Sequence, residues 1–254
     1  MEKVDEMQLK TVLMKDRMDL FEAQNKIVVK VWPKFMLNDT VSNKYFFRLY
    51  EDFPEYQYLL MQGEEIVGSG NSLPLFWDKK PKDLPDEGWD WALIKGFEDK
   101  EKDINTNVLC AISITINPKY QRKGISSEMV KAMLKIGKVH NLESLILPAR
   151  PTLKKNYPLI PMKKYIHWVR EDGTPFDPWL RVHTRLGAEI IKVCPKAMKI
   201  AGSISDWKNW TGMNFPYSGK YIIPEALQPI EFDVERDIGI YFDPNVWTIH
   251  RLKN

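Results

Sequence analysis

Residues 107–141 read NVLCAISITINPKYQRKGISSEMVKAMLKIGKVHN, and the rest of the chain is arranged around this stretch. Its first part, residues 108–116, is an apolar run rich in β-branched side chains, which predicts a strand. Asn117 and Pro118 end that strand, because proline has no amide hydrogen to donate to a sheet. From Ile125 onward, apolar residues recur at helical spacing and lysines take the other side, which predicts an amphipathic helix.

A short basic loop, residues 121–126, joins the predicted strand to the predicted helix. Such a loop presents free backbone amides and the positive end of the helix dipole, which together bind anions. Gly124 lets the backbone approach a phosphate closely, and Arg122 and Lys123 add positive charge. The loop has neither a Walker pattern nor a three-glycine dinucleotide fingerprint. We therefore predict a phosphate-binding loop made of Gln121, Arg122, Lys123, Gly124, Ile125 and Ser126. The alternative is a surface loop whose lysines only solvate a turn.

This strand, loop and helix resemble the Q/R-x-x-G-x-G/A element of the GNAT acyltransferase superfamily, whose loop amides bind the pyrophosphate of acyl-CoA. Ser126 stands where that family usually has Gly or Ala. The resemblance covers about residues 27–194. It implies an α/β fold, with a GNAT-like mixed, mostly antiparallel central sheet flanked by helices. It also implies acetyl-CoA or another acyl-CoA as the cofactor, whose pantetheine arm enters where the fourth and fifth strands splay apart.

Periodicity and turn residues predict the other elements along the chain. We expect strands at residues 27–31, 56–61, 65–73, 145–149, 188–194, 219–223 and 238–242. We expect helices at residues 40–51 and 178–187, and a helix or arm over residues 1–25.

We find no internal repeat and predict one elaborated domain over residues 1–254. Its core spans about residues 27–200, and a C-terminal extension covers about residues 203–254. An insertion at about residues 74–106 separates the third and fourth strands and is rich in tryptophan. The insertion is either helical and covers the acceptor side of the site, or it is a satellite core beneath a long loop.

Composition excludes several classes of protein. Of the 254 residues, 44% are hydrophobic, which is ample for a buried core. A net charge of +3 is too small to indicate nucleic-acid binding. There is no apolar run of about 18 residues, so we expect no membrane span. Residues 1–15 are charged and lack the apolar region of a secretion signal, so we expect a cytoplasmic protein. We expect it to be a monomer or a homodimer.

Cysteine and histidine usage indicates no metal site. Cys110 and Cys194 lie in apolar, strand-like runs and are expected to be buried thiols rather than a disulfide. The four histidines are scattered along the chain without a supporting cysteine pair.

Residues 183–188 read His-Thr-Arg-Leu-Gly-Ala and resemble the GNAT Y-x-x-L-G-F element, whose tyrosine is often the general acid. The resemblance puts His183 at the tyrosine position, where an imidazole could protonate the departing thiolate. Backbone amides near Ile114 to Ile116, where such strands often bulge, would polarise the thioester carbonyl. Family members often carry a base on the fourth strand, but residues 108–116 contain no carboxylate.

The missing base keeps a second chemistry open. GNAT-like domains of polyketide synthase loading modules decarboxylate malonyl-type thioesters with a His and a Thr, and the chain offers His183 and Thr152. The first hypothesis is an acyl-CoA-dependent N-acetyltransferase that acts on an amine. The alternatives are a malonyl-type thioester decarboxylase or S-acyltransferase, and a non-catalytic acyl-CoA-binding protein. The expected partner is a small-molecule or carrier-protein-bound acyl substrate.

Overall fold

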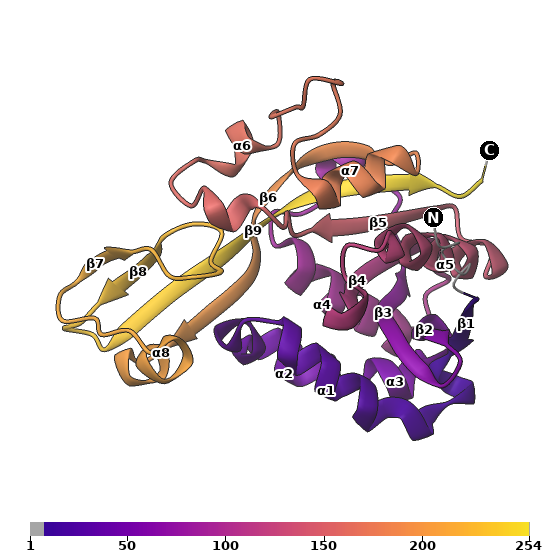
Figure 1. The fold of residues 1–254 in the computed structure, drawn as a ribbon, viewed down its shortest axis with the longest axis horizontal. Coiled ribbons are helices and arrows are strands. Elements are labelled where there is room, and N and C mark those ends of the chain that lie inside the picture. Colours follow the sequence, from indigo (N-terminus) through magenta and orange to yellow (C-terminus); the bar gives the residue numbers. More distant parts are fainter. Residues whose placement is uncertain (1–7, 254) are drawn as a thin grey trace, which may run out of the picture.

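The computed structural model describes residues 8–253, and the strands in that range form one nine-stranded sheet (Figure 1). The order along the sheet is β1-β2-β3-β4-β5-β9-β8-β7, with β6 paired to β9 outside this path. Strands β4 and β5 are parallel, and the other described pairs are antiparallel. The strands are Leu9–Leu13 (β1), Tyr58–Gln62 (β2), Glu65–Leu75 (β3), Val108–Ile116 (β4), Ser144–Ala149 (β5), Glu189–Gly202 (β6), Gly219–Tyr221 (β7), Ile230–Asp233 (β8) and Ile238–Arg251 (β9).

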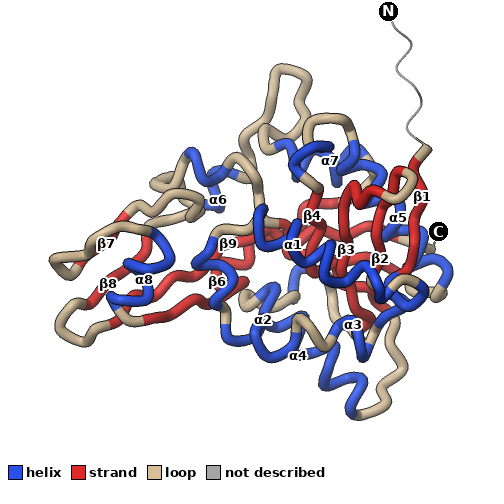
Figure 2. Tube along the Cα trace, turned by 60° about the horizontal axis from the view of Figure 1, so that its bottom comes forward, coloured by secondary structure: helices blue, strands red, loops and turns tan. Residues whose placement is uncertain are grey.

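Helices pack on both faces of this sheet. Helix α1 lies across β2, β3 and β4 (Figure 2), and Trp32 at its end donates from Nε1 to Oγ1 of Thr115 on β4 at 3.1 Å. Helix α5 covers the opposite face, where the Tyr58 hydroxyl donates to the Met129 carbonyl at 2.5 Å. The α-helices are Phe21–Val31 (α1), Thr40–Tyr45 (α2), Leu49–Asp52 (α3), Gly88–Glu101 (α4), Ile125–Val139 (α5), Met162–Tyr165 (α6), Pro178–Arg185 (α7) and Ile204–Thr211 (α8).

The structure confirms the central prediction. Strand β4 and helix α5 occupy the predicted ranges, and a short turn and the 121–126 loop join them. The parallel pairing of β4 with β5 requires such a crossover, because two parallel strands cannot be joined by a tight hairpin. The strands predicted at residues 56–61 and 65–73 are confirmed as the antiparallel pair β2 and β3. The predicted mixed, mostly antiparallel GNAT-like sheet is therefore correct.

The prediction of a strand at residues 27–31 is wrong, because these residues form the second half of α1. Gln24 and Val28, which are one helical turn apart, are both buried, whereas Val29 is 53% exposed. This burial follows a helical period, so the contacts of one helix face outweigh the strand preference of β-branched residues. The first strand is instead β1, inside the segment expected to be a helix or arm. Residues 1–7 of that segment lie outside the described residues.

The insertion and the C-terminal part both contribute regular structure. The insertion contains the helix α4, and residues 40–51 form two short helices, α2 and α3, with Asp39 capping the first. Strand β9 is longer than predicted and pairs with β5, β6 and β8, so the C-terminal part completes the sheet. Strands β6 to β9 and helix α8 extend the sheet away from β1–β4 (Figure 1).

Both cysteines are buried free thiols, as predicted. Burial raises the pKa of Cys110 and of Cys194, so both remain protonated at neutral pH. Among residues 8–253, no helix combines the length and apolar character needed to span a bilayer.

Candidate functional site

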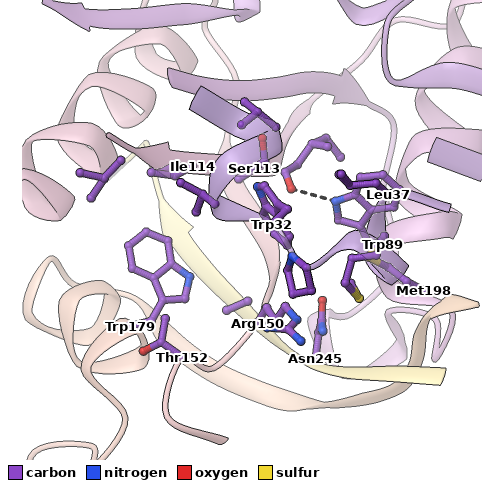
Figure 3. A pocket seen from close by; sticks show the side chains of 18 of the residues that line it. Trp32, Leu37, Trp89, Ser113, Ile114, Arg150, Thr152, Trp179, Met198 and Asn245 are labelled. Atoms are coloured by element: carbon purple, nitrogen blue, oxygen red, sulfur yellow. Dashed lines mark hydrogen bonds between the residues drawn. The ribbon is translucent and has the colours of Figure 1, made fainter. Parts of the chain in front are cut away.

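A gap between β4 and β5 holds the main cavity. The two strands pair only where Val108–Cys110 faces Ser144–Ile146, and beyond that point they separate. The cavity in the gap has a volume of about 800 Å³ (Figure 3). Its walls come from α1, α7, β4 and β5, with Trp32, Trp89 and Trp179 among the lining side chains. A space of this size and apolar character suits a small-molecule ligand.

The 121–126 loop lies at one end of this cavity. Arg122 and Gly124 have positive φ angles of 64° and 77°. Within the described chain, the backbone amides of residues 122–126 donate to no protein acceptor. A Cβ placed on Gly124 would meet no atom within 4 Å, so the turn opens to solvent. Consecutive unpaired amides in a left-handed turn before a helix form an anion-binding concavity.

The predicted phosphate-loop residues fall into two groups. Gln121 and Ser126 line the cavity, as do Ile114 and Ile116 of β4. Arg122, Lys123 and Gly124 are exposed on the rim. The Lys123 ammonium lies 5.1 Å from the centre of the Tyr120 ring, which holds it beside the loop. Ile125 points the other way and is 2% exposed in the core, so its contribution to the loop is through its backbone.

The predicted bulge near residues 114–116 is wrong. Ile114 and Ile116 pair in register with Gly70 and Gly68 of β3. The register shifts at Ile112 instead, because Asn71 pairs with Ser113 while Ser72 pairs with Ala111.

Trp89, from the insertion, contacts this bulge and donates from Nε1 to the Ile112 carbonyl at 2.8 Å (Figure 3). The insertion therefore contributes directly to the cavity wall. Because β5 has left the edge of β4 beyond Cys110, outward backbone groups of β4 face the gap.

The two predicted catalytic side chains are in different surroundings. Thr152 lines the cavity. His183 is 1% exposed and is absent from the described cavity lining, and its Nδ1 lies 3.0 Å from Nε2 of His250 on β9. Burial, reinforced by His250, lowers the pKa of His183 to about 3, so this imidazole is neutral at physiological pH. The Trp179 ring packs edge-on against it, with ring centres 4.4 Å apart.

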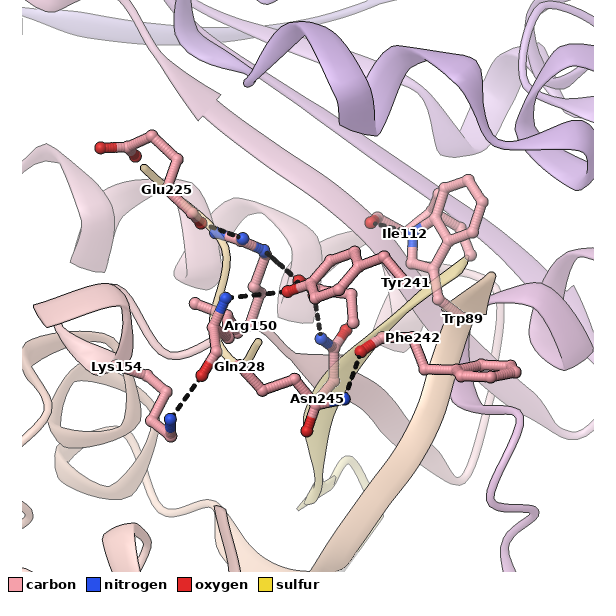
Figure 4. Close-up of polar contacts among 11 residues, drawn as sticks. Trp89, Ile112, Arg150, Lys154, Glu225, Gln228, Tyr241, Phe242 and Asn245 are labelled. Atoms are coloured by element: carbon pink, nitrogen blue, oxygen red, sulfur yellow. Dashed lines mark hydrogen bonds and ion pairs between the residues drawn. The ribbon is translucent and has the colours of Figure 1, made fainter. Parts of the chain in front are cut away.

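A polar cluster that sequence reasoning missed occupies the wall beyond β5 (Figure 4). Arg150 follows β5 directly and donates from Nε to both carboxylate oxygens of Asp243, at 3.2 and 3.0 Å. Asp243 is fully buried and also accepts from the Tyr241 hydroxyl at 2.6 Å and from Asn245 Nδ2 at 2.7 Å. An aspartate in an otherwise apolar, strand-like run was the signal in the sequence, since a buried charge needs a partner.

Comparison with known proteins supports a common architecture and chemistry. Residues 18–164 match the acetyltransferase (GNAT) family. An arginine N-acetyltransferase, avaD of Aspergillus versicolor, is 30% identical over 261 residues, covering 92% of this chain and 89% of that protein.

Two solved structures share the fold. The loading GNATL domain of CurA from Lyngbya majuscula superposes with a TM-score of 0.61 at 20% identity, covering 96% of this chain and 97% of that one. The GphF GNAT-like decarboxylase, in complex with isobutyryl-CoA, superposes with a TM-score of 0.53 at 15% identity, covering 97% of this chain and 100% of that one.

Proposed function

The chain belongs to the acetyltransferase (GNAT) family and is an acyltransferase that uses an acyl-CoA, and on this premise we propose that it transfers an acetyl group from acetyl-CoA to the primary amine of a small molecule. The named activity of the 30% identical relative, an arginine N-acetyltransferase, supports an amine acceptor. The 121–126 loop then binds the pyrophosphate of the cofactor, and the pantetheine arm follows the gap between β4 and β5.

One observation carries this proposal: the unpaired amides of residues 122–126 belong to the loop whose Gln121 and Ser126 line the cavity that separates β4 from β5. An anion cradle joined to a largely apolar tunnel matches a ligand with a diphosphate at one end and a slender thioester arm at the other. The exposed side chains of Arg122 and Lys123 add positive charge at the phosphate end.

The reaction needs an uncharged amine beside the thioester carbonyl. The amine nitrogen attacks the carbonyl carbon, a C–N bond forms, and the C–S bond breaks with its electron pair going to sulfur. The amine loses one proton and the thiolate takes one, so no net proton is consumed. Backbone groups of β4 beyond Cys110 face this space and are the groups available to polarise the carbonyl.

Decarboxylation of a malonyl-type thioester is the second candidate, and the position of Thr152 on the cavity wall is the observation in its favour. That chemistry, as predicted from the sequence, also needs His183 to face the bound thioester. His183 is buried behind the wall, with Nδ1 directed at His250. This arrangement favours amine acylation over decarboxylation.

The test is a pair of activity assays on the same protein preparation, one for CoA release and one for decarboxylation. With acetyl-CoA and a panel of primary amines, we expect CoA release that depends on the amine, together with an acetylated product detected by mass spectrometry. With malonyl-CoA and no amine, we expect no acetyl-CoA. Acetyl-CoA formation from malonyl-CoA would favour the decarboxylase, and binding of CoA without turnover in either assay would indicate a non-catalytic acyl-CoA-binding protein.

A further inference from the structure

The Arg150 side chain is a fixed cation on the cavity wall. It lies immediately after β5, lines the cavity, and has an exposed side-chain fraction of 16%. Its partner Asp243 is fully buried and is held by hydroxyl and amide donors from Tyr241 and Asn245. A guanidinium anchored to a buried carboxylate keeps one orientation, because moving it would leave that carboxylate uncompensated.

Arg150 lines the cavity and has hydrogen-bond donors to spare. A guanidinium carries five N–H donors. The Nε–H is bound by Asp243, and one Nη2–H is bound by the Glu225 carbonyl at 2.8 Å. Within the described chain, Nη1 donates no hydrogen bond and Nη2 donates no second one, although the Tyr241 hydroxyl also lies beside the guanidinium. Paired free N–H groups of this kind match the two oxygens of a carboxylate.

The other charged groups around the cavity do not offer a second free site for a carboxylate beside Arg150. Lys155 and Glu225 also line the cavity, but they pair with each other at 2.7 and 2.8 Å. The Gly124 loop lies after β4, on the other side of the gap, where the phosphates are proposed to bind. Arg150 is therefore separate from the phosphate cradle.

We propose that Arg150 binds the carboxylate of the acyl acceptor, so that the substrates are amines with a free carboxylate, such as α-amino acids. This inference rests on the proposed acetyl transfer and adds the chemical class of the acceptor. The carboxylate docks on the free edge of the guanidinium, Asp243 fixes that edge, and the amino group is left to approach the thioester.

The experiment compares the free acid and the primary amide of L-arginine and of L-leucine. Binding is measured by calorimetry on protein saturated with CoA, and acetylation by product formation from acetyl-CoA. We expect at least one free acid to bind roughly tenfold more tightly than its amide, as a charge-assisted hydrogen-bonded pair allows. Equal affinities of acid and amide in the wild type would overturn the proposal.

Two variants test the role of Arg150. Arg150→Gln with Asp243→Asn removes both charges of the pair together, so neither Arg150 nor Asp243 is left as an uncompensated partner, and the preference for the acid should disappear. Arg150→Lys keeps the charge beside Asp243 but not the planar fork, so it should reduce the preference if the double variant fails to fold. Arg236→Gln is the matched control, because Arg236 is 84% exposed and pairs with Asp233 at the surface; the preference should not change.

Three other outcomes can be told apart. An unchanged preference for the acid in both Arg150 variants would refute the role of Arg150. A wild-type preference for malonyl-CoA over acetyl-CoA that disappears in the double variant would also refute it, because the anion would then belong to the acyl donor. If no amine is acetylated although the free acid binds better, the proposed acetyl transfer fails while carboxylate binding stands.

Discussion

His183 on α7 and His250 on β9 face each other inside the protein, with Nδ1 of the first 3.0 Å from Nε2 of the second. One shared hydrogen can join the two rings only if at least one of them is neutral. The outer nitrogens, Nε2 of His183 and Nδ1 of His250, are buried without a hydrogen-bond partner in the described structure. Burial lowers the pKa of both rings, and that of His183 falls to about 3. The pair thus connects α7 to β9 as neutral imidazoles.

This pair predicts a loss of stability in acid. In the unfolded chain a histidine binds a proton below about pH 6.5, whereas the folded pair stays neutral. The free energy of unfolding should therefore fall as the pH drops from about 6.5 toward 3. Replacing both residues, His183→Gln with His250→Gln, should flatten this part of the curve, measured by urea unfolding across the pH range. Parallel curves for the wild type and the double variant would contradict the assignment.

The buried carboxyl groups of Asp39 and Asp90 predict the opposite pH dependence of the free energy of unfolding. Asp39 accepts from the Ser42 amide at 2.6 Å and Asp90 from the Lys199 amide at 3.0 Å. Burial, and then the neighbouring charge of Asp39, raise the pKa of Asp90 to about 8. The folded protein holds a proton that an unfolded aspartate releases above about pH 4, so stability should fall as the pH rises from about 4 to about 8.

Asp90→Asn should remove that decline, because an amide can donate to Asp39 at any pH. Unfolding in urea at about pH 5 and about pH 9 measures the difference. Asp86→Asn is the control, since Asp86 is 51% exposed and pairs with Lys192 at the surface, where a salt bridge contributes little. An Asp90→Asn variant that loses as much stability as the wild type at high pH would show that Asp90 does not hold this proton.

Local patterns were sufficient to predict the central elements. The C-terminal end of β4 and the start of α5 are marked by Pro118 and Gly124, and both signals lie next to the elements they bound. The segment 27–31 failed because its β-branched residues favour a strand locally, whereas packing of α1 against β3 and β4 imposes a helix. Tertiary packing of this kind leaves no local signal.

The polar groups of the site could be predicted only in part. The phosphate loop is one continuous segment, so its geometry follows from its own sequence. Arg150 and Asp243 are 93 residues apart, and His183 and His250 are 67 residues apart. Each pair meets only because β9 lies between β5 and β6, and this order of strands depends on the whole sheet.

Trp89, which donates to the carbonyl of Ile112 at the bulge in β4, predicts a local effect on cofactor binding. Trp89→Phe removes the donor to the Ile112 carbonyl, and leaving that acceptor unpaired should cost about 1–3 kcal/mol of stability. Because Ile112 lines the cavity, the Kd for acetyl-CoA should also rise several-fold.

Trp247→Phe is the matched control, since Trp247 donates in the same way to the Pro85 carbonyl at 2.7 Å and is not among the residues that line the cavity. Unfolding and acetyl-CoA titration of both variants separate the two effects. Equal changes of affinity in the two variants would show that the bulge has no specific role.

The central claim is that the amides around Gly124 bind the pyrophosphate of acyl-CoA. Gly124→Glu adds a negative charge at the cradle, and Gly212→Glu adds the same side chain at a glycine of similar φ, 72° against 77°, that also has open space around it. Both variants carry the same backbone strain, because both glycines are left-handed. Only the first is at the proposed phosphate site.

The direct measurement is calorimetric titration of acetyl-CoA into the wild type and these two variants. We expect Gly212→Glu to bind like the wild type and Gly124→Glu to lose detectable binding while it still unfolds cooperatively. Equal acetyl-CoA affinity of all three proteins would contradict the account.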